Sequence, residues 1–261
     1  SAIRNPKPAI EVKAMARTFT RFGVLIASLT LLFSGCERGS NKDTVAPDPP
    51  VVLPASECTA PAEQGIDAVP DGNRIRLEWW VGSEEDLAGY EIYRHREGEA
   101  VDSLVAVLSI EEIPGEVAFY EDEDMAPRVR YFYTIKAFDE ANNASTVSDT
   151  LTYMLLSKLM PDQPRGDITD RIPEFVFQWG DDPLPIVSYV IKVTDAMGTY
   201  LWISDLFIAQ EYDTPVHIVF NVDGRANSDS LESGVYFWRV DGIGAEDYSG
   251  SESRWMRFKV Q

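Results

Sequence analysis

Cysteine and histidine are scarce in this chain, which has two of each among 261 residues. Two cysteines form one disulfide bond at most, so a fold built on several disulfides is excluded and stability must come from hydrophobic cores. His95 and His217 are the only side chains that ordinarily titrate near neutral pH. They lie far apart in the sequence, so the chain offers little for acid–base catalysis.

Motifs for catalysis and cofactor binding are also lacking. The chain has no Gly-x-Ser-x-Gly, no phosphate-binding loop, no His-Glu-x-x-His and no Cys-x-x-Cys. Acidic residues cluster at 84–86, 121–124 and 181–182, but adjacent carboxylates supply only two or three of the six to eight oxygens that calcium takes. We interpret these clusters as solvated turns. We expect no catalytic residue, no metal and no cofactor, and predict that the protein is not an enzyme; a hydrolase with a hidden cleft is the alternative.

The chain also lacks an apolar run long enough to span a membrane as a helix, which takes ~20 residues. The longest run extends from Phe22 to Phe33, after Arg17 and Arg21 and directly before Ser34-Gly35-Cys36. A basic start, a short apolar run and small residues before a cleavage point are typical of an export signal.

The cysteine that ends this segment makes it similar to the signal peptide and lipobox of a bacterial lipoprotein. The resemblance implies cleavage before Cys36, acyl chains on that cysteine, and a place in the cell envelope facing the periplasm or the exterior. Phe33 departs from the usual leucine, and an uncleaved anchor or a plain secretory signal is the alternative. We interpret residues 1–35 as an upstream extension plus this signal.

Positive charge is scarce, with 23 lysines and arginines against 43 acids and a net charge of −20. Without residues 1–35, which hold five of the basic residues and one acid, the net charge is −24. A chain of this charge repels nucleic acid and anionic headgroups. We therefore expect no nucleic-acid partner, and membrane contact only through the lipid on Cys36.

Residues 36–58 are predicted to be a flexible tether, because the prolines of Ala46-Pro47-Asp48-Pro49-Pro50 oppose helix and central strand. Beyond it, period-two alternation such as Ile75-x-Leu77-x-Trp79 predicts antiparallel β-sandwiches and an all-β fold. No convincing helical period occurs there. Cys58, before the first sandwich, is predicted to be an unpaired thiol; an intermolecular disulfide is the alternative.

The strand pattern occurs twice, since Trp79 is matched by Trp179 and Tyr131 by Tyr236. Self-similarity at a period of about 100 residues indicates two copies of one domain. We predict domains at 59–157 and 158–261, with a boundary near Ser157–Pro164, where Pro161 and Pro164 stop the last strand of the first copy.

The first copy is similar to fibronectin type III domains. Its matching motifs are Leu77-x-Trp79, the run 86–94, Tyr120-x-Asp122 and Tyr131-x-Tyr133-x-Ile135. The resemblance implies that Trp79 packs between two sheets and that the hydroxyl group of Tyr131 bonds back to the chain at a corner. The second copy departs from the pattern after Val240, so another immunoglobulin-like sandwich is the alternative there.

Exposed aromatic residues are the remaining candidates for ligand binding. Trp80 and Trp255 are out of phase with the core positions beside them, and Trp202 lies in a strand either face of which could be buried. These three tryptophans are candidate ligand-binding residues; the alternative is that they cover a sheet edge or a joint. We predict a non-catalytic envelope lipoprotein whose sandwiches serve as a spacer or bind an envelope protein. Carbohydrate binding through the tryptophans is the alternative function.

Overall fold

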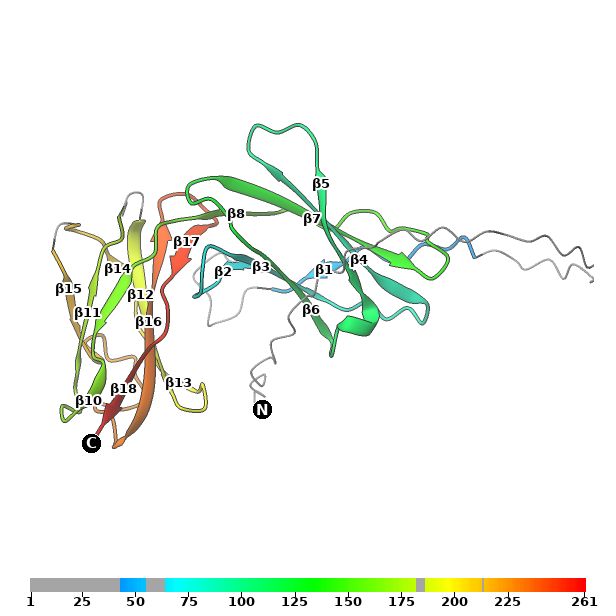
Figure 1. The fold of residues 1–261 in the computed structure, drawn as a ribbon. Coiled ribbons are helices and arrows are strands. Elements are labelled where there is room, and N and C mark those ends of the chain that lie inside the picture. The colour runs from blue at the N-terminus through cyan, green and yellow to red at the C-terminus, as the bar shows by residue number, and fades with distance from the viewer. Residues whose placement is uncertain (1–42, 55–63, 182–185, 213) are drawn as a thin grey trace, which may run out of the picture. The chain divides into compact units, whose positions relative to one another are not determined.

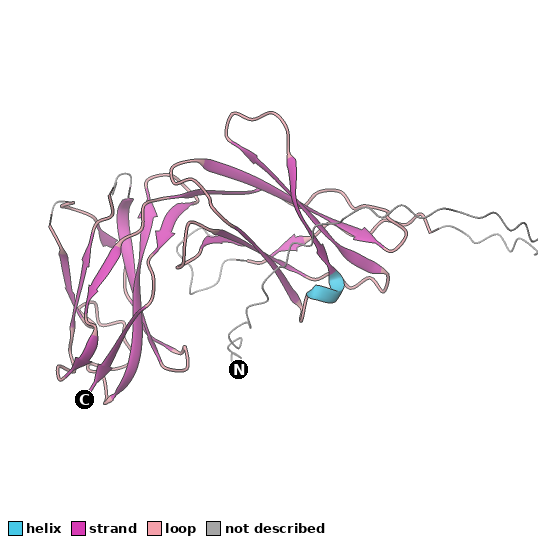
Figure 2. Ribbon diagram, in the orientation of Figure 1, coloured by secondary structure: helices cyan, strands magenta, loops and turns pink. Residues whose placement is uncertain are grey.

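The computed structural model describes residues 43–54, 64–181, 186–212 and 214–261. Within them, regular structure consists of strands and one 3-10 turn, η1 (Ile110–Glu112), so the predicted all-β fold class is confirmed (Figure 2). In these ranges no helix has the length and apolar character that crossing a membrane would take. The predicted signal segment, Cys36 and Cys58 lie outside the described residues.

The first sandwich is formed by two antiparallel sheets (Figure 1). In the smaller sheet, β3 (Ile75–Trp80) pairs with β1 (Val51–Val52), β2 (Ile66–Ala68) and β6 (Val117–Asp122). The other sheet has the order β8 (Leu151–Leu155), β7 (Arg130–Asp139), β4 (Leu87–Arg96) and β5 (Ser103–Ser109).

Alternation along the strands builds the core between these sheets. Ile75, Leu77 and Trp79 of β3 are fully buried, while the residues between them are partly exposed. The Trp79 ring meets Tyr90 of β4 edge to face, with ring centroids 5.3 Å apart. Trp79 therefore packs between the sheets as the resemblance implies, and such aromatic pairs add about 1 kcal/mol beyond the area they bury.

The second sandwich again has two layers. The smaller sheet has the order β15 (Val216–Val219), β11 (Glu174–Gln178) and β9 (Met160–Gln163). In the larger sheet, β16 (Gly234–Gly244) pairs with β12 (Ile186–Asp195), β17 (Ser249–Glu252) and β18 (Met256–Val260). At the edges, β12 also pairs with β13 (Tyr200–Ile203) and β14 (Phe207–Ile208), and β18 pairs in parallel with β10 (Gly166–Ile168).

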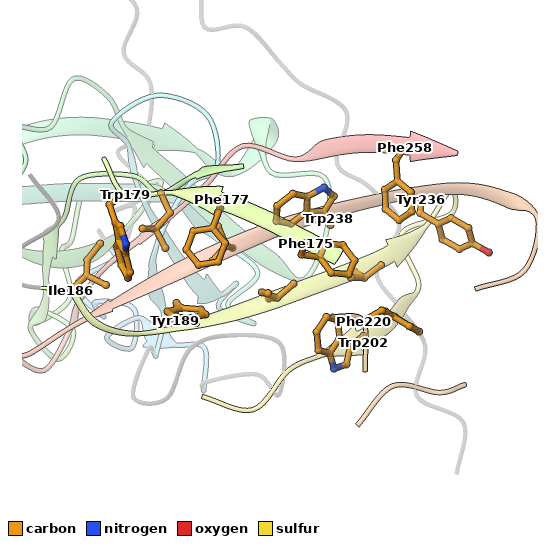
Figure 3. Packing of buried hydrophobic residues seen from close by; sticks show 14 of the residues in the cluster. Phe175, Phe177, Trp179, Ile186, Tyr189, Trp202, Phe220, Tyr236, Trp238 and Phe258 are labelled. Carbon is orange, nitrogen blue, oxygen red and sulfur yellow. The ribbon is translucent and has the colours of Figure 1, made fainter. Parts of the chain in front are cut away.

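Aromatic rings fill the core of this second sandwich (Figure 3). The ring of Phe175 lies 5.0 Å from Trp238 and 5.7 Å from Trp202, measured between centroids. Phe258 closes one end, with its ring 6.2 Å from Phe175. These rings come from strands of both sheets, so their packing joins the two layers.

A serine is repeated at matching places in both sandwiches. The hydroxyl group of Ser148 accepts a hydrogen bond from the backbone N–H of Ile135, and Ser253 accepts one from Val240 in the same way. Each serine then donates to the carbonyl oxygen of the next residue. Because both partners are displaced by 105 residues, the same pair of hydrogen bonds recurs shortly before the last strand of each sandwich.

Two details of the predicted organisation are wrong. Residues 43–54 were assigned to the tether, but Val51–Val52 form β1 against Trp79–Trp80, and the amide group of Asn143 binds the carbonyl oxygen of Asp43. A short strand that tolerates proline beside it can add to a sheet at its margin. Pro161 and Pro164 do not stop the last strand of the first sandwich, since that strand ends at Leu155 and Pro161 already lies within β9.

The described residues belong to one compact unit, and a backbone ladder joins its two sandwiches. Strand β8 of the first pairs in parallel with β17 of the second, Met154 with Ser249 and Leu155 with Gly250. The ladder continues into the connection, where the N–H of Leu156 donates to the carbonyl oxygen of Gly250 at 2.8 Å.

Candidate functional site

Trp80 lies at the end of β3 on the solvent side of the small sheet in the first sandwich. Its neighbours across the sheet are Val51 of β1 and Val117 of β6. Trp80 is 44% exposed, and Val51 and Phe119 are exposed too. We call these four residues (Val51, Trp80, Val117 and Phe119) the Trp80 face. The alternation of β3 produces it, because Trp80 follows the buried Trp79.

Charged side chains border the Trp80 face. The guanidinium group of Arg76 lies 4.1 Å from the centre of the Phe119 ring, and its Nε is 2.8 Å from a carboxylate oxygen of Glu78. Arg76 also reaches Glu121 at 3.4 Å. An apolar centre with a polar border is the composition of a protein-binding surface, and a flat indole beside hydrogen-bonding groups also suits a sugar ring.

Trp202 is not a surface residue, and its prediction as a ligand-binding residue is wrong. It is 1% exposed, and its ring packs against Phe175 and Phe220 (Figure 3). Its indole N–H donates to the carboxylate of Asp223 at 2.9 Å. The alternation of β13 left either face open, and Trp202 is buried because its ring packs against core residues that are distant in sequence.

Trp255 is partly buried and covers a charged side chain. Its ring centre lies 4.9 Å from the guanidinium carbon of Arg239, which is itself buried. One face of the indole is therefore occupied by this cation–π contact. Of the three predicted tryptophans, Trp80 has the most open ring, and the structure does not bring them together in one site.

A cluster of buried charges lies beneath Trp255, and sequence reasoning missed it. The ion cluster contains Lys192 of β12, Arg239 and Asp241 of β16, and Glu252 of β17, all of them buried. Strand register places them together, since Lys192 pairs with Arg239 and Asp241 pairs with Glu252. The available signal was Arg239-x-Asp241, two charges on one face of an otherwise apolar strand.

The ion cluster is held by short charged contacts. Lys192 Nζ lies 2.8 Å from Asp241 Oδ2, and both terminal nitrogens of Arg239 donate to the carboxylate of Glu252. Burial lowers the pKa of Arg239, but Asp241 and Glu252 outweigh burial and raise it overall. Burial raises the pKa of Glu252 above its usual range, against the opposing effect of Arg239.

The two histidines lie in different sandwiches, and each pairs with a carboxylate. His95 Nδ1 is 2.6 Å from Asp102, and its ring stacks on Phe132. His217 is exposed, with Nδ1 3.1 Å from Glu174. This arrangement gives no reason to assign either ring a catalytic role.

One group of carboxylates could hold a cation. Oxygens of Asp43, Asp86 and Asp139 lie within 4.8 Å of one another, although the residues come from three separate segments. A hydrogen bond with Asp43 raises the pKa of Asp86, and Asn143 donates to Asp139 through both its backbone and its side-chain nitrogen. Three carboxylates are fewer ligands than calcium takes, so we assign no metal to them.

No family model matches this chain, and none of the curated proteins matches it. Among solved structures, the chain is similar to the crystal structure of the chicken CNTN1 FN1–FN3 domains, with 17% sequence identity and a TM-score of 0.34. The match covers 82% of this chain and 69% of the other. The fold assignment therefore rests on the strands and cores described above.

Proposed function

We propose that this protein is a non-catalytic lipoprotein of the bacterial cell envelope, in which tandem β-sandwiches serve as a spacer or bind a partner protein. The observation that carries the proposal is the Trp80 face, an exposed apolar surface on a chain with a net charge of −20. Aromatic residues at the centre of a polar border are the side chains that contribute most to protein binding.

Membrane attachment is the second part of the proposal, and the segment from Arg17 to Cys36 supports it. One acyl chain gives only reversible binding, whereas two or more anchor a protein stably. The test is fractionation of cells that express the wild-type chain or Cys36→Ser. Wild type is expected with the membrane and Cys36→Ser in the soluble fraction; if Cys36→Ser stays with the membrane, the lipid anchor is wrong.

Protein binding is tested by crosslinking in intact cells with a photoreactive amino acid at position 119, in the wild-type chain and in Trp80→Ala. A single crosslinked species in the wild type that disappears in Trp80→Ala is the expected result. Crosslinker at position 197, in the second sandwich, is the control for random collision. The same species from both positions, or none from position 119, contradicts a partner at the Trp80 face.

Carbohydrate binding is the alternative, and the 44% exposure of Trp80 beside charged side chains favours it. Retention of the wild-type chain on immobilised envelope glycans would be compared with Trp80→Ala and with Trp255→Ala. Loss of retention in Trp80→Ala alone supports a stacking role for this indole. Equal elution of all three proteins excludes it.

A further inference from the structure

Lys158 occupies the short connection between the two sandwiches. The connection has four residues, from Leu156 after β8 to Leu159 before β9. Leu156 and Leu159 are each 2% exposed and belong to the core of the second sandwich. The residues on both sides of Lys158 are therefore anchored in a hydrophobic core, whereas a flexible linker would consist of exposed polar residues.

The ammonium group of Lys158 bonds to both sandwiches at once. It donates to the carbonyl oxygens of Val69 at 2.5 Å and Pro70 at 3.1 Å, which follow β2 in the first sandwich. It also donates to the carbonyl oxygen of Glu252 at 2.8 Å, at the end of β17 in the second. An ammonium group has three N–H donors, so these three acceptors use all of them.

Other bonds between the sandwiches surround this lysine. The hydroxyl group of Ser251 donates to the carbonyl oxygen of Ser157 at 3.2 Å. Farther along, Arg130 of β7 donates to the carboxylate of Glu246 at 2.9 Å and to the carbonyl oxygen of Asp247. The β8–β17 ladder connects backbone to backbone, and these side-chain bonds add to it at the joint.

The charges around the joint are a poor source of stability. Taking ions out of water costs several kcal/mol for each, and a buried ion pair often does no better than apolar side chains of the same volume. Hydrogen bonds to charged groups are directional, however, and apolar contacts are not. The burial of these charges is therefore better explained by a requirement for one geometry than by a requirement for more stability.

We propose that Lys158 is a lock that fixes the two sandwiches in one arrangement, so that they move as a single rigid arm. This inference goes beyond the proposed function, because it concerns the joint and holds whether or not Cys36 carries lipid. A rigid arm would hold the Trp80 face at a constant distance from the second sandwich.

The test is a distance distribution between two spin labels, one in each sandwich of the full-length chain. Val101 and Met197 are 74% and 86% exposed and are replaced by cysteine for labelling, with Cys36→Ser and Cys58→Ser to remove the native thiols. The unaltered joint is expected to give one narrow distribution. Lys158→Met should broaden it roughly twofold or more, because relative domain motion is the default once an interface is weakened. Lys259→Met, in β18, is the matched control and should leave it unchanged.

A folding defect is distinguished by hydrogen exchange in the same proteins. In Lys158→Met the amide of Leu156, which bonds across the joint, should exchange faster while the amides of Ile92 and Ile191 in the two cores keep their protection. If those core amides also lose protection, Ser251→Ala replaces Lys158→Met, and a broader distribution is again expected. A broad distribution in the unaltered joint, or an unchanged one in the folded variant, overturns the lock.

Discussion

The hydroxyl group of Tyr131 accepts a hydrogen bond from the backbone N–H of Ala126 at 3.1 Å, which ties the start of β7 to the loop before it. Tyr236 holds the matching position in the second sandwich, where its hydroxyl group donates to the carbonyl oxygen of Glu232 at 2.8 Å. The two phenols thus fasten equivalent corners with opposite hydrogen-bond direction. The resemblance drawn from the sequence implied the corner at Tyr131.

Tyr131→Phe is expected to lower the free energy of unfolding by about 1–2 kcal/mol, because the N–H of Ala126 loses its partner while the ring keeps its packing. Urea denaturation followed by tryptophan fluorescence measures the change. Tyr93→Phe is the control, since the Tyr93 hydroxyl group bonds only to Glu91 on the outer surface and the loss should be within about 0.5 kcal/mol. Equal losses in the two variants would argue against the corner.

Trp202→Ala should destabilise the protein by about 3–5 kcal/mol, since it empties part of an aromatic core. Trp80→Ala should change the free energy of unfolding by no more than about 1 kcal/mol, because the Trp80 ring is 44% exposed. Thermal melting of both variants measures the contrast. A large loss in Trp80→Ala would mean that this indole has a structural role.

Glu252→Gln should lower the free energy of unfolding by about 3 kcal/mol, because it removes one of the two carboxylates that face the buried guanidinium group of Arg239. The double variant Arg239→Met, Glu252→Leu should recover most of that loss, since it removes both charges together. Urea denaturation at constant salt compares the three proteins. If the double variant is as unstable as the single one, the ion cluster contributes stability by itself.

The pH dependence of stability should carry a contribution from Lys158. Burial lowers the pKa of Lys158 from its ordinary 10.5 to about 8. Between those values the unfolded state binds more protons than the folded state, so stability should rise with pH from about 8 to about 10, by about 2 kcal/mol. The difference between wild type and Lys158→Met isolates this effect. A flat difference over that range would show that the lysine has an ordinary pKa.

Alternation along the chain was sufficient to predict the strands that carry the cores. The alternation Ile75-x-Leu77-x-Trp79 predicted a strand, and these three residues lie in β3 with their side chains fully buried. The pattern works because a strand between a core and solvent must place apolar side chains on every second residue. It fails for Lys192, where the face opposite the core is also buried and a charge interrupts an apolar run.

Local periodicity was enough to predict the all-β class and the burial of Trp79, and similarity between the two halves of the chain was enough to predict the repeat. The burial of Trp202, the pairing of Val51–Val52 with a sheet and the reach of Lys158 to both sandwiches could be seen only in the folded chain. Each of these depends on contacts between residues distant in sequence. Such contacts depend on how the sheets pack and on which backbone oxygens a side chain can reach. Neither produces a periodic pattern in the amino-acid sequence.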